Sequence, residues 1–130
     1  MKTFTCEIPL RWGDMDAMGH LNNVVYFRLF EEARVQWFSQ FGLTTLPAGT
    51  APILAHVSCD FVRAMVYPGN ARVTQEVVKL GRSSVEMKLE IERSDEPGVV
   101  YASGRSVVVW FDYQAGQSAS WPEAVRQMLT

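Results

Sequence analysis

The chain has 130 residues, of which 48% are hydrophobic and 20% are charged, and its net charge at pH 7 is −2. These values are typical of a single globular domain, residues 1–130, and argue against a disordered or fibrous protein. No run or stripe of basic residues stands out, so we expect no nucleic-acid partner.

The sequence also suggests a compartment. No uninterrupted apolar stretch approaches the roughly 20 residues that a membrane-spanning helix needs. The first seven residues, MKTFTCE, contain no apolar segment typical of a secretory signal. Cys6 and Cys59 are the two cysteines, and a disulfide framework would need more. We therefore expect two buried thiols, no membrane partner and a cytoplasmic protein.

A strand, a loop and a helix are predicted in the first third of the chain. Apolar side chains alternate with others from Phe4 to Leu10, which predicts a half-buried strand. Residues 11–23 include two glycines, two aspartates, a histidine and two asparagines, and predict a loop. Residues 24–41 carry apolar side chains at helical spacing on a broad face, which predicts a helix of about five turns. A helix this apolar should be enclosed by the rest of the chain.

The ends of this helix have suitable capping residues. Asn22 or Asn23 can cap its start, because a side-chain oxygen there accepts a hydrogen bond from a free backbone N–H. Gly42 suits the position just beyond its end.

Four strand-like runs follow the helix, and turn-forming residues separate them. The runs cover residues 53–62, 71–80, 84–92 and 101–111. In the first run, alternation predicts one face made of Ile53, Ala55, Val57, Cys59 and Phe61. The third run alternates most cleanly and predicts one apolar and one polar face.

The end of the chain predicts a second, short helix. Residues 120–123, Ser-Trp-Pro-Glu, fit a capping box with a proline in the first turn, and the helix would end at Leu129. The complete order of elements predicts an α+β fold, in which an antiparallel sheet of about five strands wraps around one long central helix.

The polar loop is the part of the sequence where chemistry is most expected. It carries Asp14, Asp16 and His20, and it leads directly into a helix N-terminus, whose free N–H groups favour a developing oxyanion. A carboxylate beside such a terminus can activate water or attack a carbonyl. The alternative is that these side chains only cap the helix and close turns, which are common roles for aspartate and asparagine.

Eight residues of this region form a recognisable motif. They are Asp14, Asp16, Gly19, His20, Leu21, Asn22, Asn23 and Tyr26. Their spacing resembles the signature of hotdog-fold acyl-CoA thioesterases, in the branch similar to 4-hydroxybenzoyl-CoA thioesterase. The order of predicted elements also resembles that family over most of the chain.

The resemblance implies a hydrolase that cleaves an acyl-CoA thioester. Asp16 matches the catalytic carboxylate, acting either as general base or as nucleophile, and the N–H of Asn23 matches the group that polarises the carbonyl. His20 would orient water or Asp16. Asp14 is expected to be structural, and Arg11 is expected to be an ion-pair partner rather than a catalytic group. Coenzyme A is part of the substrate, and no separate cofactor or metal is expected.

The resemblance also implies a homodimer or homotetramer whose active site lies between subunits. The substrate contacts that it implies are at Gly19, Asn22, Tyr26, Val57, Ser58, Cys59, Arg82, Ser83 and Ser84. Arg82 would contact a phosphate of coenzyme A, for which a guanidinium is suited, although a solvated arginine in a turn is an equally good interpretation. A pocket near Tyr26 would hold a fatty or aromatic acyl group.

Three other functions compete with thioester hydrolysis. Cys59 with His56 could form a thiol nucleophile and base, but residues three apart on a strand point to opposite faces. Asp14, Asp16 and His20 could form the metal site of a phosphotransferase, but no phosphate-binding glycine loop or partnering lysine accompanies them. The remaining alternative is a hotdog domain that binds an acyl thioester or a partner protein without hydrolysing it.

Overall fold

The computed structural model of the protein describes residues 2–41 and 48–130. In this part of the chain the helices are α1 (Asn23–Phe38) and α2 (Glu123–Leu129), and short 3-10 turns lie at η1 (Trp12–Asp14) and η2 (Ser39–Phe41). The strands are β1 (Thr3–Pro9), β2 (Thr50–Phe61), β3 (Asn70–Leu80), β4 (Ser84–Arg93), β5 (Val100–Asp112) and β6 (Gln117–Ser118).

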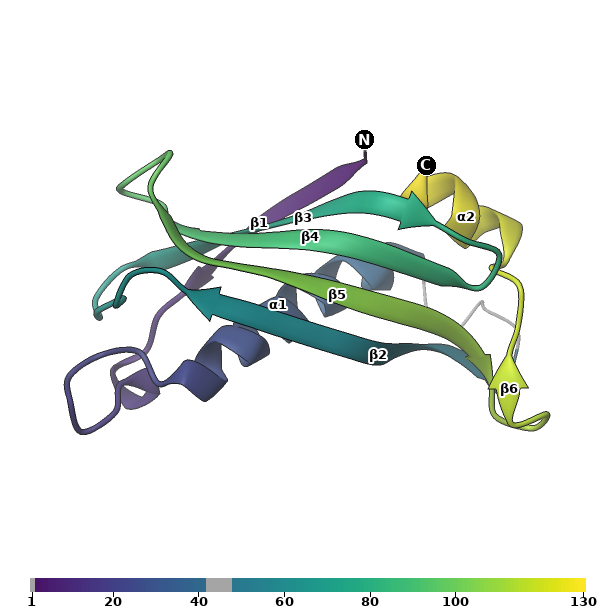
Figure 1. The fold of residues 1–130 in the computed structure, drawn as a ribbon, viewed down its shortest axis with the longest axis horizontal. Helices are drawn as coiled ribbons and strands as arrows, with labels where there is room; N and C mark the ends of the chain where they lie inside the picture. The colour runs from purple at the N-terminus through teal and green to yellow at the C-terminus, as the bar shows by residue number, and fades with distance from the viewer. Residues whose placement is uncertain (1, 42–47) are drawn as a thin grey trace.

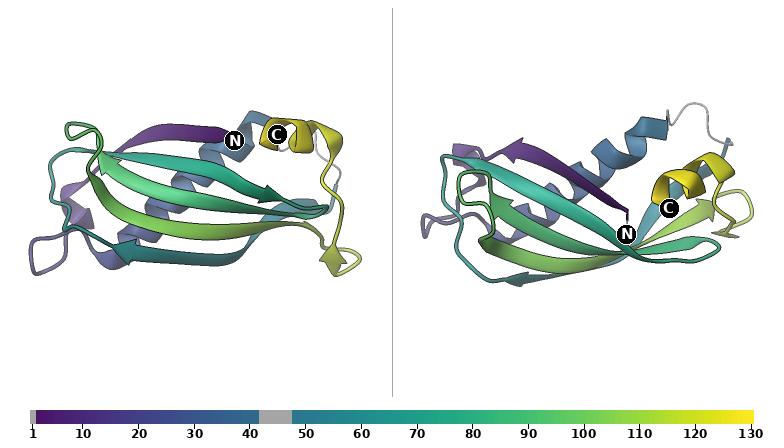
Figure 2. Two further views of the ribbon diagram at one scale, coloured as in Figure 1. Left: turned by 45° about the horizontal axis from the view of Figure 1, so that its top comes forward. Right: turned by 90° about the horizontal axis from the view of Figure 1, so that it is seen from above.

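The strands form one antiparallel sheet in the order β1-β3-β4-β5-β2, and the two-residue β6 pairs with β5. Figures 1 and 2 show the sheet curving around α1, which crosses one of its faces. The predicted fold of one long helix and a wrapped antiparallel sheet is therefore confirmed. Neither helix of the described chain is long and apolar enough to cross a membrane.

The core lies between α1 and the concave face of the sheet. Leu29, Phe30, Ala33 and Trp37 are at most 1% exposed. The predicted apolar face of β4 is confirmed, because its alternate residues Val85, Met87, Leu89 and Ile91 are all buried. Burying a large apolar side chain stabilises a protein by about 1.5–3 kcal/mol, so this layer holds helix and sheet together.

β2 departs from the alternation that its sequence predicts. Its pairing with β5 shifts between Leu54 and His56, so that Ala55 forms a β-bulge. A bulge adds one residue to one strand and reverses the alternation of its side chains. Leu54 therefore lies on the same face as Val57, and the prediction that Ile53 shares that face is wrong.

The first helix is shorter than predicted at its C-terminal end. α1 stops at Phe38, and residues 39–41 form the 3-10 turn η2. At its start, the side chain of Asn22 accepts a hydrogen bond from the N–H of Val24 at 3.0 Å, so Asn22 is the capping residue. The predicted C-terminal glycine, Gly42, lies outside the described residues.

The second helix begins without the predicted capping box. Pro122 occupies the N-cap position of α2 and makes no side-chain capping bond. The hydroxyl of Ser120 instead accepts a hydrogen bond from the Arg82 guanidinium at 2.9 Å. Trp121 packs against Trp110 with ring centroids 5.8 Å apart, so tertiary contacts rather than a local cap hold this end of the chain.

Gly104 of β5 should be essential to the pairing with β2. A Cβ at this position would overlap the carbonyl oxygen of Ser58, and overpacking of this kind costs about 1–3 kcal/mol. We expect Gly104→Ala to lower the free energy of unfolding in urea by that amount. Gly13→Ala is the control, because an added Cβ there has no neighbour within 4 Å, and an equal effect of both substitutions would contradict the prediction.

Candidate active site

The loop between β1 and α1 folds back on itself and places Asp16 near its turn. Met15 and Leu21 form an isolated antiparallel bridge, so that Asp16 lies opposite His20. The N–H of Asp16 donates to the carbonyl of His20 at 2.8 Å, and the N–H of Gly19 donates to the carbonyl of Asp16 at 3.0 Å. Gly19 has φ +79°, a backbone conformation that favours glycine.

The carboxylate of Asp16 is exposed but held in place by the loop. Its Oδ1 accepts a hydrogen bond from the N–H of Met18 at 2.9 Å and a longer one from the N–H of His20 at 3.4 Å. Both partners contact the same oxygen, so these bonds leave Oδ2 for other partners. Asp16 therefore has the turn-forming role that its sequence allowed, and it also has a carboxylate oxygen available for chemistry.

Asp14 is a structural residue, as expected from the sequence. Its side chain is 3% exposed and accepts hydrogen bonds from the backbone and guanidinium of Arg11 and, at 2.8 Å, from the guanidinium of Arg28. Burial by itself raises the pKa of Asp14. The hydrogen bonds from Arg11 and the charges of Arg28 and Arg11 outweigh it, so the pKa lies below its usual value.

The N-terminus of α1 directly follows this loop. The N–H of Asn22 donates to the carbonyl of Asp14 at 3.0 Å, and the Asn22 side chain caps the helix. Asn23 is the first helical residue, so its N–H is one of those that have no intrahelical acceptor. The structure thus fixes the carboxylate loop and the positive end of the helix relative to each other through Asp14 and Asn22.

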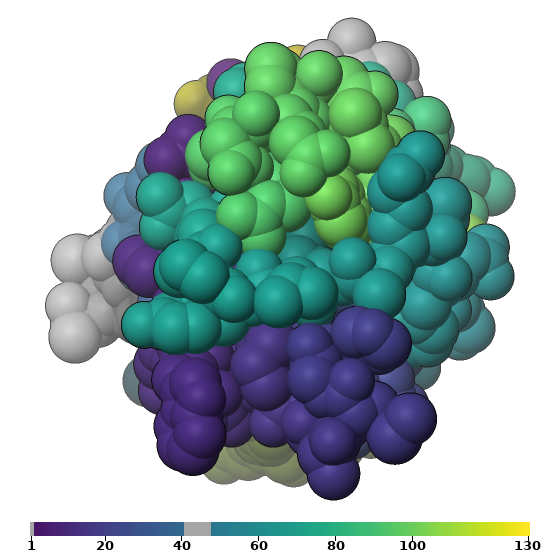
Figure 3. All heavy atoms as spheres, turned by 90° about the vertical axis from the view of Figure 1, so that its left-hand side faces the viewer, coloured from purple at the N-terminus to yellow at the C-terminus, as the bar shows by residue number. Residues whose placement is uncertain are grey.

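Asp16 lines a cavity of about 590 Å³. The opposite wall consists of Val66 and Tyr67, from the connection between β2 and β3, and Trp12 and Met15 complete the apolar part of the lining. Figure 3 shows this end of the molecule, where the polar loop in purple and blue lies against the β2–β3 connection in teal. A volume of this size is within the range of small-molecule sites.

The wall opposite Asp16 is anchored from β4. The guanidinium of Arg93 donates to the carbonyls of Val66 at 2.6 Å and Pro68 at 2.8 Å. The N–H of Tyr67 lies 3.4 Å from the sulfur of Met15, and the N–H of Leu21 donates to the carbonyl of Met65 at 2.8 Å. These bonds hold the connection against the loop, so the cavity is built from two segments distant in sequence.

The family is decided by a match over nearly the whole chain. Residues 10–129 match the model of the thioesterase-like superfamily. The chain belongs to this superfamily, and its fold is the hotdog fold.

Solved structures agree with this assignment. The chain is 32% identical to the PA2801 protein of Pseudomonas aeruginosa, for which thioesterase activity has been suggested, with a TM-score of 0.90 and 97% of both chains covered. It is 36% identical to the Xanthomonas campestris protein XC229, for which acyl-CoA thioesterase activity has been suggested, with a TM-score of 0.77 over 89% of this chain and 98% of that one. It is also 25% identical to the uncharacterized protein YsmA of Bacillus subtilis strain 168, over 98% of this chain and 85% of that protein.

Within this superfamily fold, the predicted site residues divide into two groups. Asp16, Gly19 and His20 share the loop, and Asn22 and Asn23 lie at the start of α1. His20 contacts Asp16 through its backbone, while its side chain is exposed. The amide oxygen of Asn22 is occupied as the helix cap.

The other predicted contacts lie away from the Asp16 cavity of the same chain. Tyr26 is 3% exposed, and its hydroxyl donates to the carbonyl of Arg63 at 3.3 Å, so it belongs to the core beneath the site. Residues 57–59 lie on the edge strand β2, and the turn of Arg82 to Ser84 lies at the opposite end of the sheet in Figure 1. One chain therefore does not bring these residues to Asp16.

Trp12, Val66, Tyr67 and Arg93 were not predicted as site residues, although the first three line the cavity and the last anchors its wall. The sequence contains one weak signal here, the turn-forming run Tyr67-Pro68-Gly69. Large apolar side chains at exposed positions, Trp12 at 79% and Val66 at 47%, also indicate a surface that contacts something.

The two competing chemistries find little support in the geometry. Cys59 lies on the concave side of β2 and His56 on the other, as their spacing predicts. Asp14, the first carboxylate of the suggested metal site, is occupied by two guanidiniums. The described ranges, 2–41 and 48–130, contain no cluster of three or more His, Cys, Asp or Glu side chains suited to a metal ion.

Replacing Asp14 should destabilise the fold in a way that depends on pH. Asp14→Asn removes charge-assisted hydrogen bonds to Arg11 and Arg28, and we expect a loss of about 1–3 kcal/mol at pH 7. Because the folded pKa of Asp14 is lowered, its stabilisation is complete above the unfolded pKa, about 3.9, and is lost as the pH falls through the folded value. Urea unfolding at pH 7 and at pH 3 should show the gap between wild type and Asp14→Asn shrinking at the lower pH.

Cys59 should react slowly in the folded protein. Burial, followed by the negative charge of Asp60, raises the pKa of the Cys59 thiol to about 11, and only the thiolate is nucleophilic. We expect iodoacetamide at pH 7.5 to alkylate Cys59 at least about tenfold more slowly in the native protein than in urea, as followed by peptide mass spectrometry. A native alkylation rate that levels off near pH 8.5 would contradict this.

Proposed function

We propose that the protein hydrolyses the thioester bond of an acyl-CoA, with Asp16 as the catalytic carboxylate. The observation that carries the proposal is the position of Asp16: it lines a cavity between the loop that precedes α1 and the β2–β3 connection, in a chain of the thioesterase-like superfamily. The proposal includes the cytoplasmic location expected from the sequence.

Two routes are chemically balanced for this carboxylate. As a general base, Asp16 takes a proton from water, and the resulting hydroxide attacks the carbonyl carbon. The C–S bond then breaks, Asp16 returns the proton to the departing sulfur, and coenzyme A leaves as a thiol while the acid is released. As a nucleophile, Asp16 first forms a mixed anhydride with the acyl group and expels the thiolate, and water then hydrolyses the anhydride. In both routes the free N–H of Asn23 would stabilise negative charge on the carbonyl oxygen.

The hydrogen bonds of Asp16 also favour a second candidate, a non-hydrolytic domain. Asp16 already accepts two backbone hydrogen bonds within its own turn, and a purely structural role would explain its presence. Asparagine offers the same oxygen to those N–H groups but is neither a base nor a nucleophile. Substitution by asparagine therefore separates the turn-forming role from the chemical role.

The subunits are proposed to pair through β2. This strand is 12 residues long and ends the sheet, so one of its edges has no partner strand among the described residues. Near its end, Phe61 is 46% exposed and Val62 is 58% exposed. An exposed apolar edge favours pairing with another strand. Antiparallel pairing of two copies would bring residues of the partner's β2 to the Asp16 cavity, in a dimer or in a tetramer built from two dimers.

The acyl group is proposed to be fatty or aromatic. The aromatic rings near the start of α1 pack in edge-to-face contacts, with 5.0 Å between the centroids of Tyr26 and Phe61 and 6.2 Å between those of Phe27 and Phe61. Phe61 is the exposed member of this cluster, so an acyl chain entering between two copies would meet its ring first.

Asp16→Asn should slow turnover strongly and preserve the fold. With a panel of fatty and aromatic acyl-CoA thioesters, we expect kcat/KM to fall by about 10²–10⁴-fold, the range for loss of a general base, while the urea midpoint stays within error. Full activity in Asp16→Asn would refute the assigned role, and hydrolysis of no panel member by the wild type would favour the non-hydrolytic domain. A single turnover in H₂¹⁸O, followed by mass spectrometry of the Asp16 peptide, distinguishes the two routes, because attack of water on the Asp16 carbonyl of the anhydride leaves label in Asp16.

A further inference from the structure

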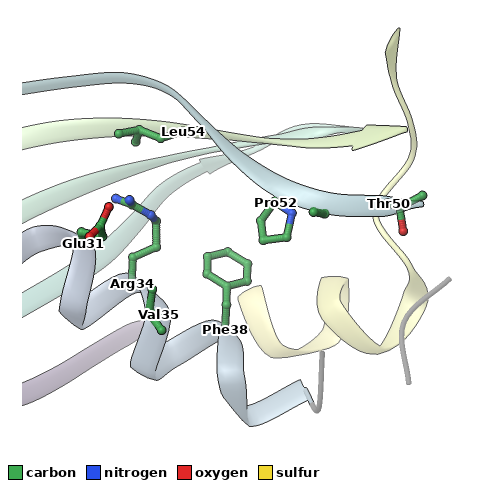
Figure 4. Close-up of a pocket in the computed structure, with 8 residues that line it drawn as sticks. Glu31, Arg34, Val35, Phe38, Thr50, Pro52 and Leu54 are labelled. Atoms are coloured by element: carbon green, nitrogen blue, oxygen red, sulfur yellow. The ribbon is translucent and has the colours of Figure 1, made fainter. Parts of the chain in front are cut away.

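A second cavity lies between α1 and the first half of β2. Its volume is about 380 Å³, and Figure 4 shows its side chains approaching from the helix on one side and the strand on the other. Most of the lining is apolar and consists of Val35, Phe38, Ala51, Pro52 and Leu54.

This cavity is separate from the one at Asp16. The two cavities have no lining residue in common. Residues of the polar loop line the first, whereas the second uses α1 residues 31–38, in the C-terminal half of that helix. Arg34 lies 11 residues after Asn23, a rise of about 16 Å along an α-helix. A ligand in this cavity would therefore not touch Asp16 of the same chain.

Arg34 is the cationic group of the cavity. In Figure 4 its side chain extends from α1 toward the space beneath β2. The hydrogen bonds and ion pairs formed within residues 2–41 and 48–130 include none to its guanidinium, and the side chain is partly buried. Burial lowers the pKa of Arg34, and the nearby charge of Glu31 acts in the opposite direction. A guanidinium that has lost part of its hydration without gaining a partner can bind an anion favourably.

The lining specifies what kind of anion fits. A planar guanidinium binds a carboxylate through two parallel hydrogen bonds. The surrounding side chains favour an apolar body, and the volume is in the range of small-molecule sites. We propose that this cavity binds a small apolar acid, with Arg34 pairing its carboxylate and the side chains of α1 and β2 enclosing its hydrocarbon part.

Glu31 tunes the strength of this site. It lies at the same cavity, one turn before Arg34 on α1, and it is exposed. Its carboxylate attracts the guanidinium and repels a bound acid, so it competes with the ligand. Removing the charge of Glu31 should strengthen binding of the acid, whereas removing that of Arg34 should weaken it.

The same carboxylate chemistry could come from two sources. One is a free acid, such as the product of a thioesterase. The other is an acyl-CoA whose acyl group carries a carboxylate at its far end. Its thioester would lie at Asp16 of another copy of the chain, because antiparallel pairing of β2 would bring this cavity toward the partner's loop. The second source rests on the proposed function, whereas the first does not.

Direct binding tests the site without any reference to hydrolysis. Octanoate and its uncharged analogue octanamide would be titrated by calorimetry into the full-length protein. We expect octanoate to bind at least about tenfold more tightly than octanamide, because a hydrogen-bonded charge pair is worth about one order of magnitude or more. In Arg34→Met the affinity for octanoate should fall by that factor while the affinity for octanamide stays the same, and in Glu31→Gln octanoate should bind more tightly.

Two further variants complete the binding experiment. Arg72→Met is the matched control, and this variant should bind octanoate as the wild type does. Arg72 is an exposed arginine of β3 on the opposite face of the sheet, where it lies across from Glu7 of β1. Leu54→Trp fills the cavity from β2 without removing a charge, and should weaken octanoate and octanamide alike. Equal affinity of the wild type for acid and amide, or unchanged octanoate binding in Arg34→Met, would overturn the proposal.

Kinetics on two substrates distinguish the two sources of the carboxylate. The substrates are octanoyl-CoA and its analogue that carries a carboxylate at the far end of the acyl group. If the cavity holds the far end of the substrate, Arg34→Met should lower kcat/KM for the carboxylated thioester by about tenfold or more and spare octanoyl-CoA. If the cavity holds the free acid, both kcat/KM values should be unchanged while octanoate binding is lost. A protein that binds octanoate but hydrolyses neither thioester would retain the site and refute only the proposed function.

Discussion

The buried carboxylate of Asp14 is the interaction on which the Asp16 loop depends. It joins the segment that follows β1, through Arg11, to α1, through Arg28, and it lies in the loop between them. Its backbone carbonyl also accepts the N–H of Asn22, the residue that caps the helix. Because the side chain is almost inaccessible, its charge is balanced by protein groups rather than by water, and this fixes where the loop meets the helix.

This arrangement explains why two neighbouring aspartates have different environments. Asp14 is surrounded by cations and fully hydrogen-bonded, so it contributes to the position of the loop and has no capacity left for chemistry. Asp16, two residues later, is exposed in a cavity and receives hydrogen bonds at one oxygen only. A rigid support for an otherwise accessible carboxylate is what a catalytic group needs, since the cost of orienting it is met during folding.

α1 organises the remaining features of the molecule. Its N-terminus follows the Asp16 loop, its middle forms the core against the sheet, and its C-terminal half carries Arg34 at a second cavity. Both cavities are closed on their other side by segments at opposite ends of β2, an edge strand. The second chain that we propose to pair along β2 would therefore lie near both cavities.

The sequence by itself determined the order of elements, the apolar faces of α1 and β4, the loop that carries Asp14 and Asp16, and the structural role of Asp14, because these depend on local periodicity and on residues close together in the chain. Only the tertiary structure decided the reversal of side-chain direction at Ala55, the start of α2 at Glu123 and the wall that Val66 and Tyr67 form opposite Asp16. It also revealed Arg34 as a guanidinium facing an apolar cavity. These features arise from strand register and from contacts between distant segments, such as the bonds from Arg93 to Val66 and Pro68, which no local pattern encodes.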